Sequence, residues 1–214
     1  MSEKNLTLRY LSKNLQNPLI NDVQTYDLRY SCYTFLMSSF IIRPATENDA
    51  HGIATVHVKT WQCAYRGQIP DSYLDSLKIS QREKTWSEML SDPKEGMYAQ
   101  IAEINGKIVG WCTFGNSRDQ DVDKTTAELA GIYVDPEYMG QGVGSSLMQE
   151  AIETMAKKGY EKITLWVLHS NKITREFYEK KGWVMEGRTK DDQREGFILH
   201  EVRYILSLGE IEKK

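Results

Sequence analysis

The sequence has few cysteines, no surplus of positive charge and no long apolar run. Its 3 cysteines are odd in number, widely spaced and without a CxxC pair, which argues against a disulfide framework or a zinc site. Lys and Arg number 27 against 30 Asp and Glu, so the net charge is −3, whereas dedicated nucleic-acid binders usually carry a basic surplus. The longest apolar stretch, residues 32–42, is interrupted by Thr34, Ser38 and Ser39 and falls short of the ~20 residues that span a bilayer.

The start of the chain also lacks the apolar run of a signal peptide, because charged residues are scattered over its first 13 positions. With 40% apolar and 27% charged residues, the composition is that of an ordinary globular protein. We therefore expect a cytoplasmic protein that binds neither nucleic acid nor membrane and holds no metal.

The chain is long enough, at 214 residues, for one domain with an appendage. Residues 1–37 contain no glycine and little helical periodicity, whereas the next seven residues, SSFIIRP, spell a short strand that ends at Pro44. We expect an N-terminal extension or arm at residues 1–37, a compact domain at residues 38–208 and a C-terminal tail at residues 209–214.

Hydrophobic periodicity predicts many strands and helices beyond residue 40. Asn105-Gly106 is the strongest hairpin signal, because both residues tolerate the positive φ angles of a type I′ turn. Ser80 to Glu83 spells a capping box, and the polar stretch 116–125, with three aspartates, indicates a solvated loop. The expected elements are a strand at 38–44, helices at 46–65 and 80–90, strands at 98–104, 107–114 and 127–134, a helix at 142–158, a strand at 162–168, a helix at 171–181, and strands at 183–188 and 197–206.

This order predicts an α/β fold. A hairpin meander comes first, and strands then alternate with helices. Such a pattern is typical of a mixed sheet that carries helices on both faces.

The most informative segment is the glycine-rich turn between the strand at 127–134 and the helix at 142–158. Gly140, Gly142 and Gly144 occupy alternate positions, and without a Cβ the backbone turns tightly and approaches a ligand closely. The first turn of the helix adds unpaired N–H groups and the positive end of the helix dipole. Together these features indicate a phosphate site that needs no lysine. The alternative, a turn that merely connects strand to helix, stays open.

Two better-known phosphate loops do not fit this segment. A P-loop requires G-x-x-x-x-G-K-[ST], and no lysine stands between Met139 and Ala156. The dinucleotide fingerprint G-x-G-x-x-G fails in both registers, because its third glycine would be Ser145 or Leu147.

Two segments resemble the GNAT superfamily of acyl-CoA-dependent N-acyltransferases. They are residues 136–147, PEYMGQGVGSSL, and residues 171–183, NKITREFYEKKGW, and the resemblance covers roughly residues 40–206. It implies a GNAT-like fold with a central mixed, mostly antiparallel sheet, a splayed pair of parallel strands and helices on both faces. It also implies acetyl-CoA as co-substrate, with its pantetheine arm in the gap between the splayed strands.

The resemblance assigns cofactor-binding roles to a set of residues around that gap. The strand before the turn would line the arm, the amides of the turn would hold the pyrophosphate, and an asparagine would bond the arm from the far side: Ile132, Tyr133 and Val134; Gly140, Gln141, Gly142, Val143, Gly144 and Ser145; and Asn171. The chain departs from the family pattern at Met139, where Arg or Gln is usual, and at Thr174, where a small residue is usual. Trp166 stands where some members carry a carboxylate, which leaves the identity of a general base open.

Acyl transfer to an amine needs a proton for the departing thiolate and a group that removes a proton from the amine. Tyr178, at the family position, is the expected proton donor, since a tyrosine with pKa ~10 stays protonated at neutral pH. Glu128 is a candidate base, although a solvated charge at a strand end is an equally good interpretation. Trp61, Tyr65 and Tyr73 are candidates for an aromatic wall around the acceptor, with plain packing as the alternative for each.

We therefore expect an N-acetyltransferase that moves acetyl from acetyl-CoA to a primary amine of a small molecule or peptide, by direct attack in a ternary complex. A homodimer is compatible with the resemblance. Two alternatives stay open: a catalytically silent acyl-CoA-binding module and a nucleotide-binding regulatory domain.

Overall fold

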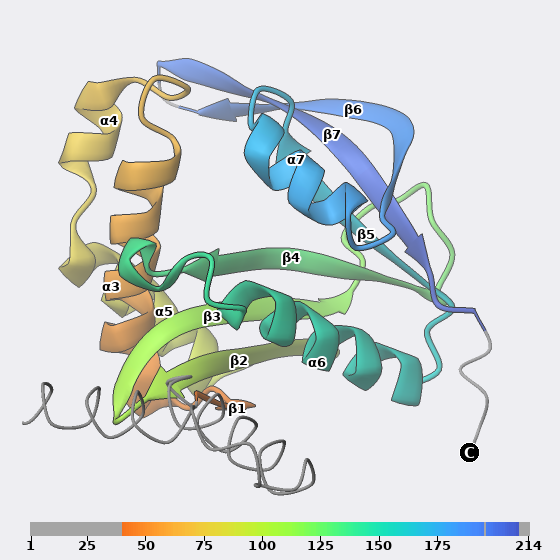
Figure 1. Cartoon of the computed structure of the whole chain (residues 1–214), viewed down its shortest axis with the longest axis horizontal. Coiled ribbons are helices and arrows are strands. Elements are labelled where there is room, and N and C mark those ends of the chain that lie inside the picture. The colour runs from red at the N-terminus through yellow and green to blue at the C-terminus, as the bar shows by residue number, and fades with distance from the viewer. Residues whose placement is uncertain (1–39, 195, 210–214) are drawn as a thin grey trace, which may run out of the picture. The chain divides into compact units, whose positions relative to one another are not determined.

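The computed structural model describes residues 40–194 and 196–209 (Figure 1). The predicted arm and nearly all of the predicted tail lie outside these described residues. Along the described ranges, no helix combines the length and the apolar character that crossing a bilayer requires. The elements in chain order are β1 (Ile41–Pro44), η1 (Glu47–Asp49), α3 (Ala50–Ala64), α4 (Asp71–Ser76), α5 (Ile79–Ser91), β2 (Met97–Ile104), β3 (Lys107–Asn116), β4 (Thr126–Val134), η2 (Pro136–Tyr138), α6 (Val143–Lys157), β5 (Lys162–Leu168), α7 (Lys172–Glu179), β6 (Val184–Arg194) and β7 (Phe197–Ser207).

The strands form one seven-stranded sheet in the order β1-β2-β3-β4-β5-β7-β6. All neighbouring strands are antiparallel except β4 and β5. That parallel pair is joined only between 126–128 and 162–164, after which the two strands diverge (Figure 1). The predicted mixed, mostly antiparallel sheet with a splayed parallel pair is confirmed. The divergence leaves the β5-facing backbone groups of residues 129–134 outside any ladder with β5.

Helices cover both faces of the sheet, as predicted. The apolar stripe of α6, which includes Leu147 and Met155, packs in one core with Val109 of β3. The buried side of α3 packs with Trp111 of the same strand in a second core. Val109 and Trp111 are two positions apart and would share a face of a regular strand. The register skips Val109, because Ala102 pairs with Gly110 and Glu103 with Ile108, and this bulge lets Val109 and Trp111 pack in different cores.

The hairpin between β2 and β3 has the predicted turn. Asn105 has φ 49° and Gly106 has φ 78°, so both central residues are left-handed, as a type I′ turn requires. Because Ile104 pairs with Lys107, the loop between the strands consists of Asn105 and Gly106.

The region between α3 and β2 differs from the prediction in two places. The helix α4 was not predicted, because its six residues are too few to show helical periodicity. The capping box at Ser80 is wrong, because α5 begins at Ile79 with Lys78 as its N-cap, and Ser80 therefore lies inside the first turn. Ile79 packs against the α3 core and starts the helix earlier, while Glu83 binds His51 at 2.8 Å instead.

Candidate active site

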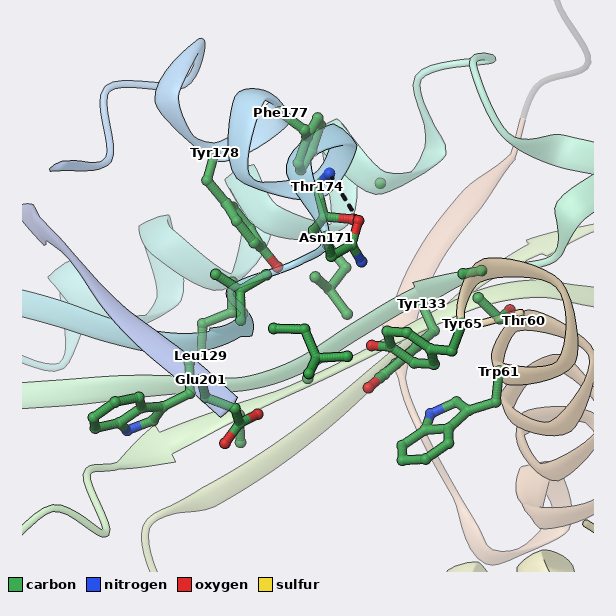
Figure 2. A pocket seen from close by; sticks show the side chains of 18 of the residues that line it. Thr60, Trp61, Tyr65, Leu129, Tyr133, Asn171, Thr174, Phe177, Tyr178 and Glu201 are labelled. Carbon is green, nitrogen blue, oxygen red and sulfur yellow. Dashed lines mark hydrogen bonds between the residues drawn. The ribbon is translucent and has the colours of Figure 1, made fainter. Parts of the chain in front are cut away.

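A cleft of about 1010 Å³ opens where β4 and β5 diverge (Figure 2). It is lined by the end of α3, the free part of β4, the glycine turn, the end of β5, one side of α7 and the β6–β7 hairpin. Segments that are more than a hundred residues apart in the sequence therefore meet at one site.

The glycine turn borders this cleft with its main chain. Gly140 and Gly142 have φ of 75° and 87°, and Gly142 is the left-handed N-cap of α6. The first bond of the helical ladder runs from Ser146 N–H to the Gly142 carbonyl at 3.0 Å, so the earlier amides of the turn precede the ladder. A Cβ built on Gly144 would lie 3.4 Å from Val134 Cγ2 and 4.0 Å from Phe177 Cζ, in the space between β4 and α7. A diphosphate and the chain attached to it fit this cradle, which a side chain would partly fill.

The residues predicted to line the cofactor arm lie along the same cleft. Ile132, Tyr133 and Val134 line it from β4, which is the position that the predicted role requires. The side chains of Gln141 and Val143 do not line it. Gln141 turns back to donate to the Glu137 carbonyl at 3.0 Å, and Val143 is buried in the α6 core. Only the main chain of these two residues is placed for the predicted contacts.

Asn171 lies across the cleft from β4, at the N-cap of α7 (Figure 2). Its Oδ1 accepts a hydrogen bond from the Thr174 backbone N–H at 3.2 Å, which satisfies one of the unpaired donors of the helix end. The amide NH₂ is not used in that bond. Asn171 is buried, so its NH₂ group is held at the cleft wall as a donor.

Tyr178 points its hydroxyl into the cleft from the other end of α7 (Figure 2). Its ring is 6% exposed and packs against Trp183 and Tyr204, with centroids 5.8 and 6.4 Å away. Burial raises the pKa of Tyr178 above the usual value near 10, because a phenolate would lose its hydration. The hydroxyl is therefore a protonated donor at neutral pH.

Glu128 lines the cleft from β4, but its carboxylate is already paired. Oε2 accepts from Arg118 Nε at 2.9 Å and from the Arg118 backbone N–H at 3.1 Å, while Oε1 accepts from Arg118 Nη2. Burial alone would raise the pKa of Glu128, but the Arg118 guanidinium outweighs burial and the pKa is lowered. A carboxylate held in this way is a weak proton acceptor.

Two of the three residues of the predicted aromatic wall line the cleft. Trp61 and Tyr65 line the cleft with centroids 5.1 Å apart. Tyr73 does not line this cleft; it packs behind the wall, 4.8 Å from Phe197 at the tip of the β6–β7 hairpin. The structure does not bring Tyr73 to the cleft lining, because α4 turns its ring toward the hairpin, and a contact between Tyr73 and the acceptor stays a prediction. Further back, burial lowers the pKa of His57 to about 3, which keeps this histidine neutral.

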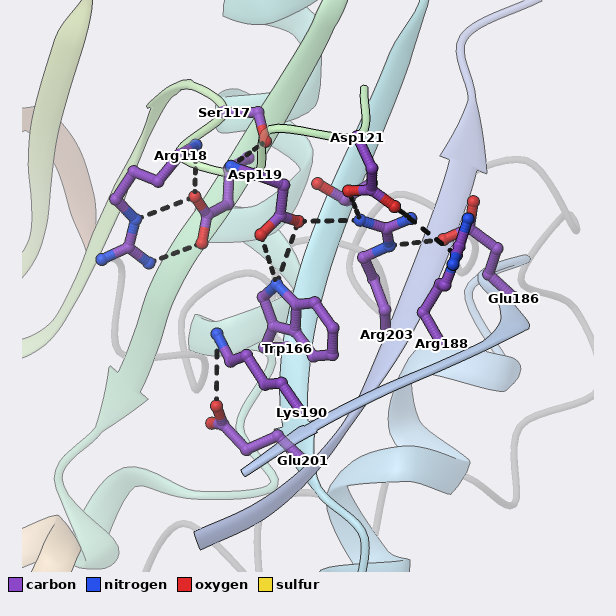
Figure 3. A network of polar contacts seen from close by, with 12 residues as sticks. Ser117, Arg118, Asp119, Asp121, Trp166, Glu186, Arg188, Lys190, Glu201 and Arg203 are labelled. Atoms are coloured by element: carbon purple, nitrogen blue, oxygen red, sulfur yellow. Dashed lines mark hydrogen bonds and ion pairs between the residues drawn. The ribbon is translucent and has the colours of Figure 1, made fainter. Parts of the chain in front are cut away.

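The loop after β3, residues 116–125, is largely exposed, as predicted, but two of its three aspartates are also paired with a strand of the sheet. Arg203 of β7 is buried and pairs with Asp119 at 3.1 Å and with Asp121 at 2.7 and 2.9 Å (Figure 3). Asp119 also accepts from Trp166 Nε1 at 3.0 and 3.1 Å. The loop is therefore linked to β5 and β7, and the Asp119 carboxylate lies beside Trp166 at the cleft.

Sequence reasoning missed a second group of charged residues at the cleft. Lys190 of β6 and Glu201 of β7 both line it, and Lys190 Nζ lies 3.3 Å from Glu201 Oε2 (Figure 3). The sequence held a signal for this pair. Arg194 pairs with Phe197 across the turn that contains Gly196, and four residues further along each strand Lys190 pairs with Glu201. The signal was lost because β6 was predicted to end at residue 188.

Comparisons with known proteins agree with this geometry. The sequence model of the "Acetyltransferase (GNAT) family" matches residues 57–183, which is more than half of the chain. An uncharacterized N-acetyltransferase of Methanocaldococcus jannaschii is 30% identical over 149 residues, covering 69% of this chain and 62% of that protein, so the chain spans under two thirds of its length. The N-acetyltransferase YuaI of Bacillus subtilis is 31% identical over 130 residues, which are 61% of this chain and 72% of that protein.

The fold also matches solved structures. The PaiA N-acetyltransferase of Thermoplasma acidophilum, determined in complex with coenzyme A, aligns with a TM-score of 0.61 at 21% identity, over 79% of this chain and 99% of that one. This similarity shows a shared architecture. Together with the family match, it leads to one conclusion: the chain belongs to the GNAT family of acetyltransferases.

Proposed function

We propose that this N-acetyltransferase moves the acetyl group of acetyl-CoA directly to a primary amine of a small molecule or peptide while both substrates are bound. The observation that carries the proposal is the glycine turn, whose main-chain amides border a cleft that no Cβ fills at Gly140, Gly142 or Gly144. The coenzyme A in the PaiA structure, which shares this fold, supports the same ligand class here. Acetyl-CoA supplies the acetyl group as an activated thioester.

Both main-chain groups and side chains of the cleft would bind that co-substrate. The amides of residues 140–145 would hold the diphosphate at the N-terminus of α6, where the helix dipole favours negative charge. Backbone groups of Ile132, Tyr133 and Val134, free of a ladder with β5, would bond the amides of the arm. Asn171 would donate its NH₂ group from the opposite wall.

Tyr178 would stabilise the departing thiolate. Its hydroxyl is aimed into the cleft and stays protonated because burial raises its pKa. A positioned donor of this kind hydrogen-bonds the sulfur as negative charge develops and then delivers the proton. Glu128, by contrast, would hold Arg118 in place, since both of its oxygens are occupied by that residue.

The proposal is tested by acetyl transfer from radiolabelled acetyl-CoA to spermidine, L-methionine, 2-phenylethylamine and a peptide with a free N-terminus. Tyr178→Phe should lower kcat about a hundredfold, the size of a general-acid contribution, and leave coenzyme A affinity unchanged. Tyr98→Phe is the matched control, because Tyr98 packs against Phe114 away from the cleft. Full turnover by Tyr178→Phe would refute the donor role, and coenzyme A binding without turnover on any amine would identify a catalytically silent acyl-CoA-binding module.

A further inference from the structure

Glu201 lies on the side of the sheet opposite to α7. Along β7, Val202 and Tyr204 join the core that contains Tyr178, whereas Leu199 joins the cluster of α3, α4 and the hairpin tip. Side chains alternate along a strand, so Glu201 shares the face of Leu199. Its partner in the register, Leu168 of β5, belongs to the same cluster. The two faces meet at the gap between β4 and β5, and Glu201 and Tyr178 both line the cleft there (Figure 2).

The carboxylate of Glu201 has one oxygen in use. Oε2 pairs with Lys190 Nζ at 3.3 Å, and the side chain is 18% exposed. Among the described residues, Oε1 has no hydrogen-bond or ion-pair partner. Glu128 differs, because Arg118 occupies both of its oxygens. Of these two cleft carboxylates, Glu201 is the one that can accept a further donor.

The surroundings of Glu201 suit an ammonium group. Its charge, added to burial, raises the pKa of Tyr65 and of Tyr133, which keeps both hydroxyls neutral around the same space. Lys190 of β6 and Arg118 of the loop after β3 interact with its charge. The cleft is also lined by further charged side chains: Asp119, Glu128, Asp191, Asp192 and Arg194. Lys190 pairs with Glu201 itself and Arg118 pairs with Glu128, so a carboxylate already balances each of these two cations.

We infer that Glu201 receives the ammonium group of the acceptor and removes its proton. The inference rests on the proposed function and names the group that prepares the nucleophile. The acceptor class is a primary amine whose body lies against the apolar and aromatic side chains of Trp61, Tyr65 and Leu199.

One N–H bond of the ammonium breaks and its proton passes to Glu201 Oε1, which leaves a neutral amine with a lone pair. The nitrogen forms a bond to the acetyl carbon, and the C–S bond breaks with its electron pair on sulfur. Tyr178 gives its proton to that sulfur and regains one from the nitrogen as the amide forms. The products are the acetamide, the thiol of coenzyme A and a protonated Glu201, which loses its proton to water.

The inference is tested by the kcat/KM of wild type and Glu201→Gln on the same four amines, from about pH 6 to about pH 9, below the amine pKa of ~10. Glu201→Gln should lose about 10²- to 10⁴-fold at neutral pH, the range of a general-base contribution. The loss should shrink by about tenfold per pH unit as free amine becomes available without a base. The coenzyme A affinity and the melting temperature should stay at wild-type values.

Two further variants make the result specific. Glu150→Gln makes the same change on the exposed side of α6 and should behave as wild type. Glu128→Gln removes the partner of Arg118 but no base, so any loss of kcat/KM in this variant should not shrink as the pH rises. A loss in Glu201→Gln that is equal at every pH, or no loss, overturns the role of Glu201 while leaving the proposed function intact. If wild type acetylates none of the four amines, the proposed function falls, and this inference falls with it.

Discussion

At the scale of single residues, Asn171 shows how one side chain serves both the fold and the site. Its Oδ1 accepts from Thr174 N–H and caps α7, while its NH₂ group stays available at the wall of the cleft. Because the two halves of the amide have separate tasks, two substitutions can separate them.

Asn171→Asp keeps the capping oxygen and removes the donor, whereas Asn171→Ala removes both. We expect Asn171→Ala to lose about 1 kcal/mol of unfolding free energy, as cap removal usually does, and Asn171→Asp to lose little. Both should weaken coenzyme A binding about fivefold, which corresponds to one hydrogen bond of about 1 kcal/mol. Urea unfolding and titration calorimetry measure the two effects, and unaltered coenzyme A affinity in Asn171→Asp would refute the donor role.

At the scale of elements, Arg43 links β1 to the start of α3 through ion pairs. Its Nη1 and Nη2 donate to Asp49 at 2.8 Å, and Nη2 also donates to Glu103 of β2 at 2.8 Å. Asp49 further accepts from the backbone N–H of Thr46 at 2.7 Å. This contact fixes where α3 begins, and α3 carries Trp61 to the cleft.

The Arg43 hydrogen bonds lower the pKa of Asp49 from 3.8 to about 2. A depressed carboxyl pKa adds stability above the unfolded value, and this stability is lost as pH falls through the folded value. Asp49→Asn should therefore cost about 2 kcal/mol at neutral pH, and the difference from wild type should disappear between pH 4 and pH 2. Urea unfolding across that range measures it, with exposed Glu95→Gln as the control; a difference that does not vary with pH would contradict the assignment.

The elements also show what sequence can predict. The Asn105-Gly106 turn and the helix α6 are set by neighbours in sequence, and so is the start of α7 near Asn171. These features were predicted because their signals are local. Two other contacts depend on how the loop after β3 folds back over the sheet: the pairing of Glu128 with Arg118 and the hydrogen bond from Trp166 to Asp119. No periodicity reports such contacts, so the sequence predicted an exposed loop but not the partners of its side chains.

At the scale of the whole molecule, the split between β4 and β5 makes one cleft accessible from two faces of the sheet. The glycine turn, Asn171 and Tyr178 come from α6 and α7 on one side. The wall of Trp61 and the Glu201 carboxylate come from α3 and the β6–β7 hairpin on the other. In the proposed reaction, this arrangement would let the two substrates reach one point from opposite sides, as direct transfer requires.

The central claim, that the main chain of the glycine turn holds coenzyme A, is tested most directly by Gly144→Ala. Gly144 is helical and a Cβ there makes only ordinary contacts at 3.4 Å and beyond, so alanine should stabilise α6 by up to about 1 kcal/mol. Its methyl group would meet a ligand in the gap between β4 and α7, an overpacking cost of about 1–3 kcal/mol. Ser146→Ala, on the same helix away from the cleft lining, is the control. Calorimetry should show coenzyme A affinity falling about ten- to a hundredfold in Gly144→Ala alone; wild-type affinity in a folded Gly144→Ala protein would contradict the account.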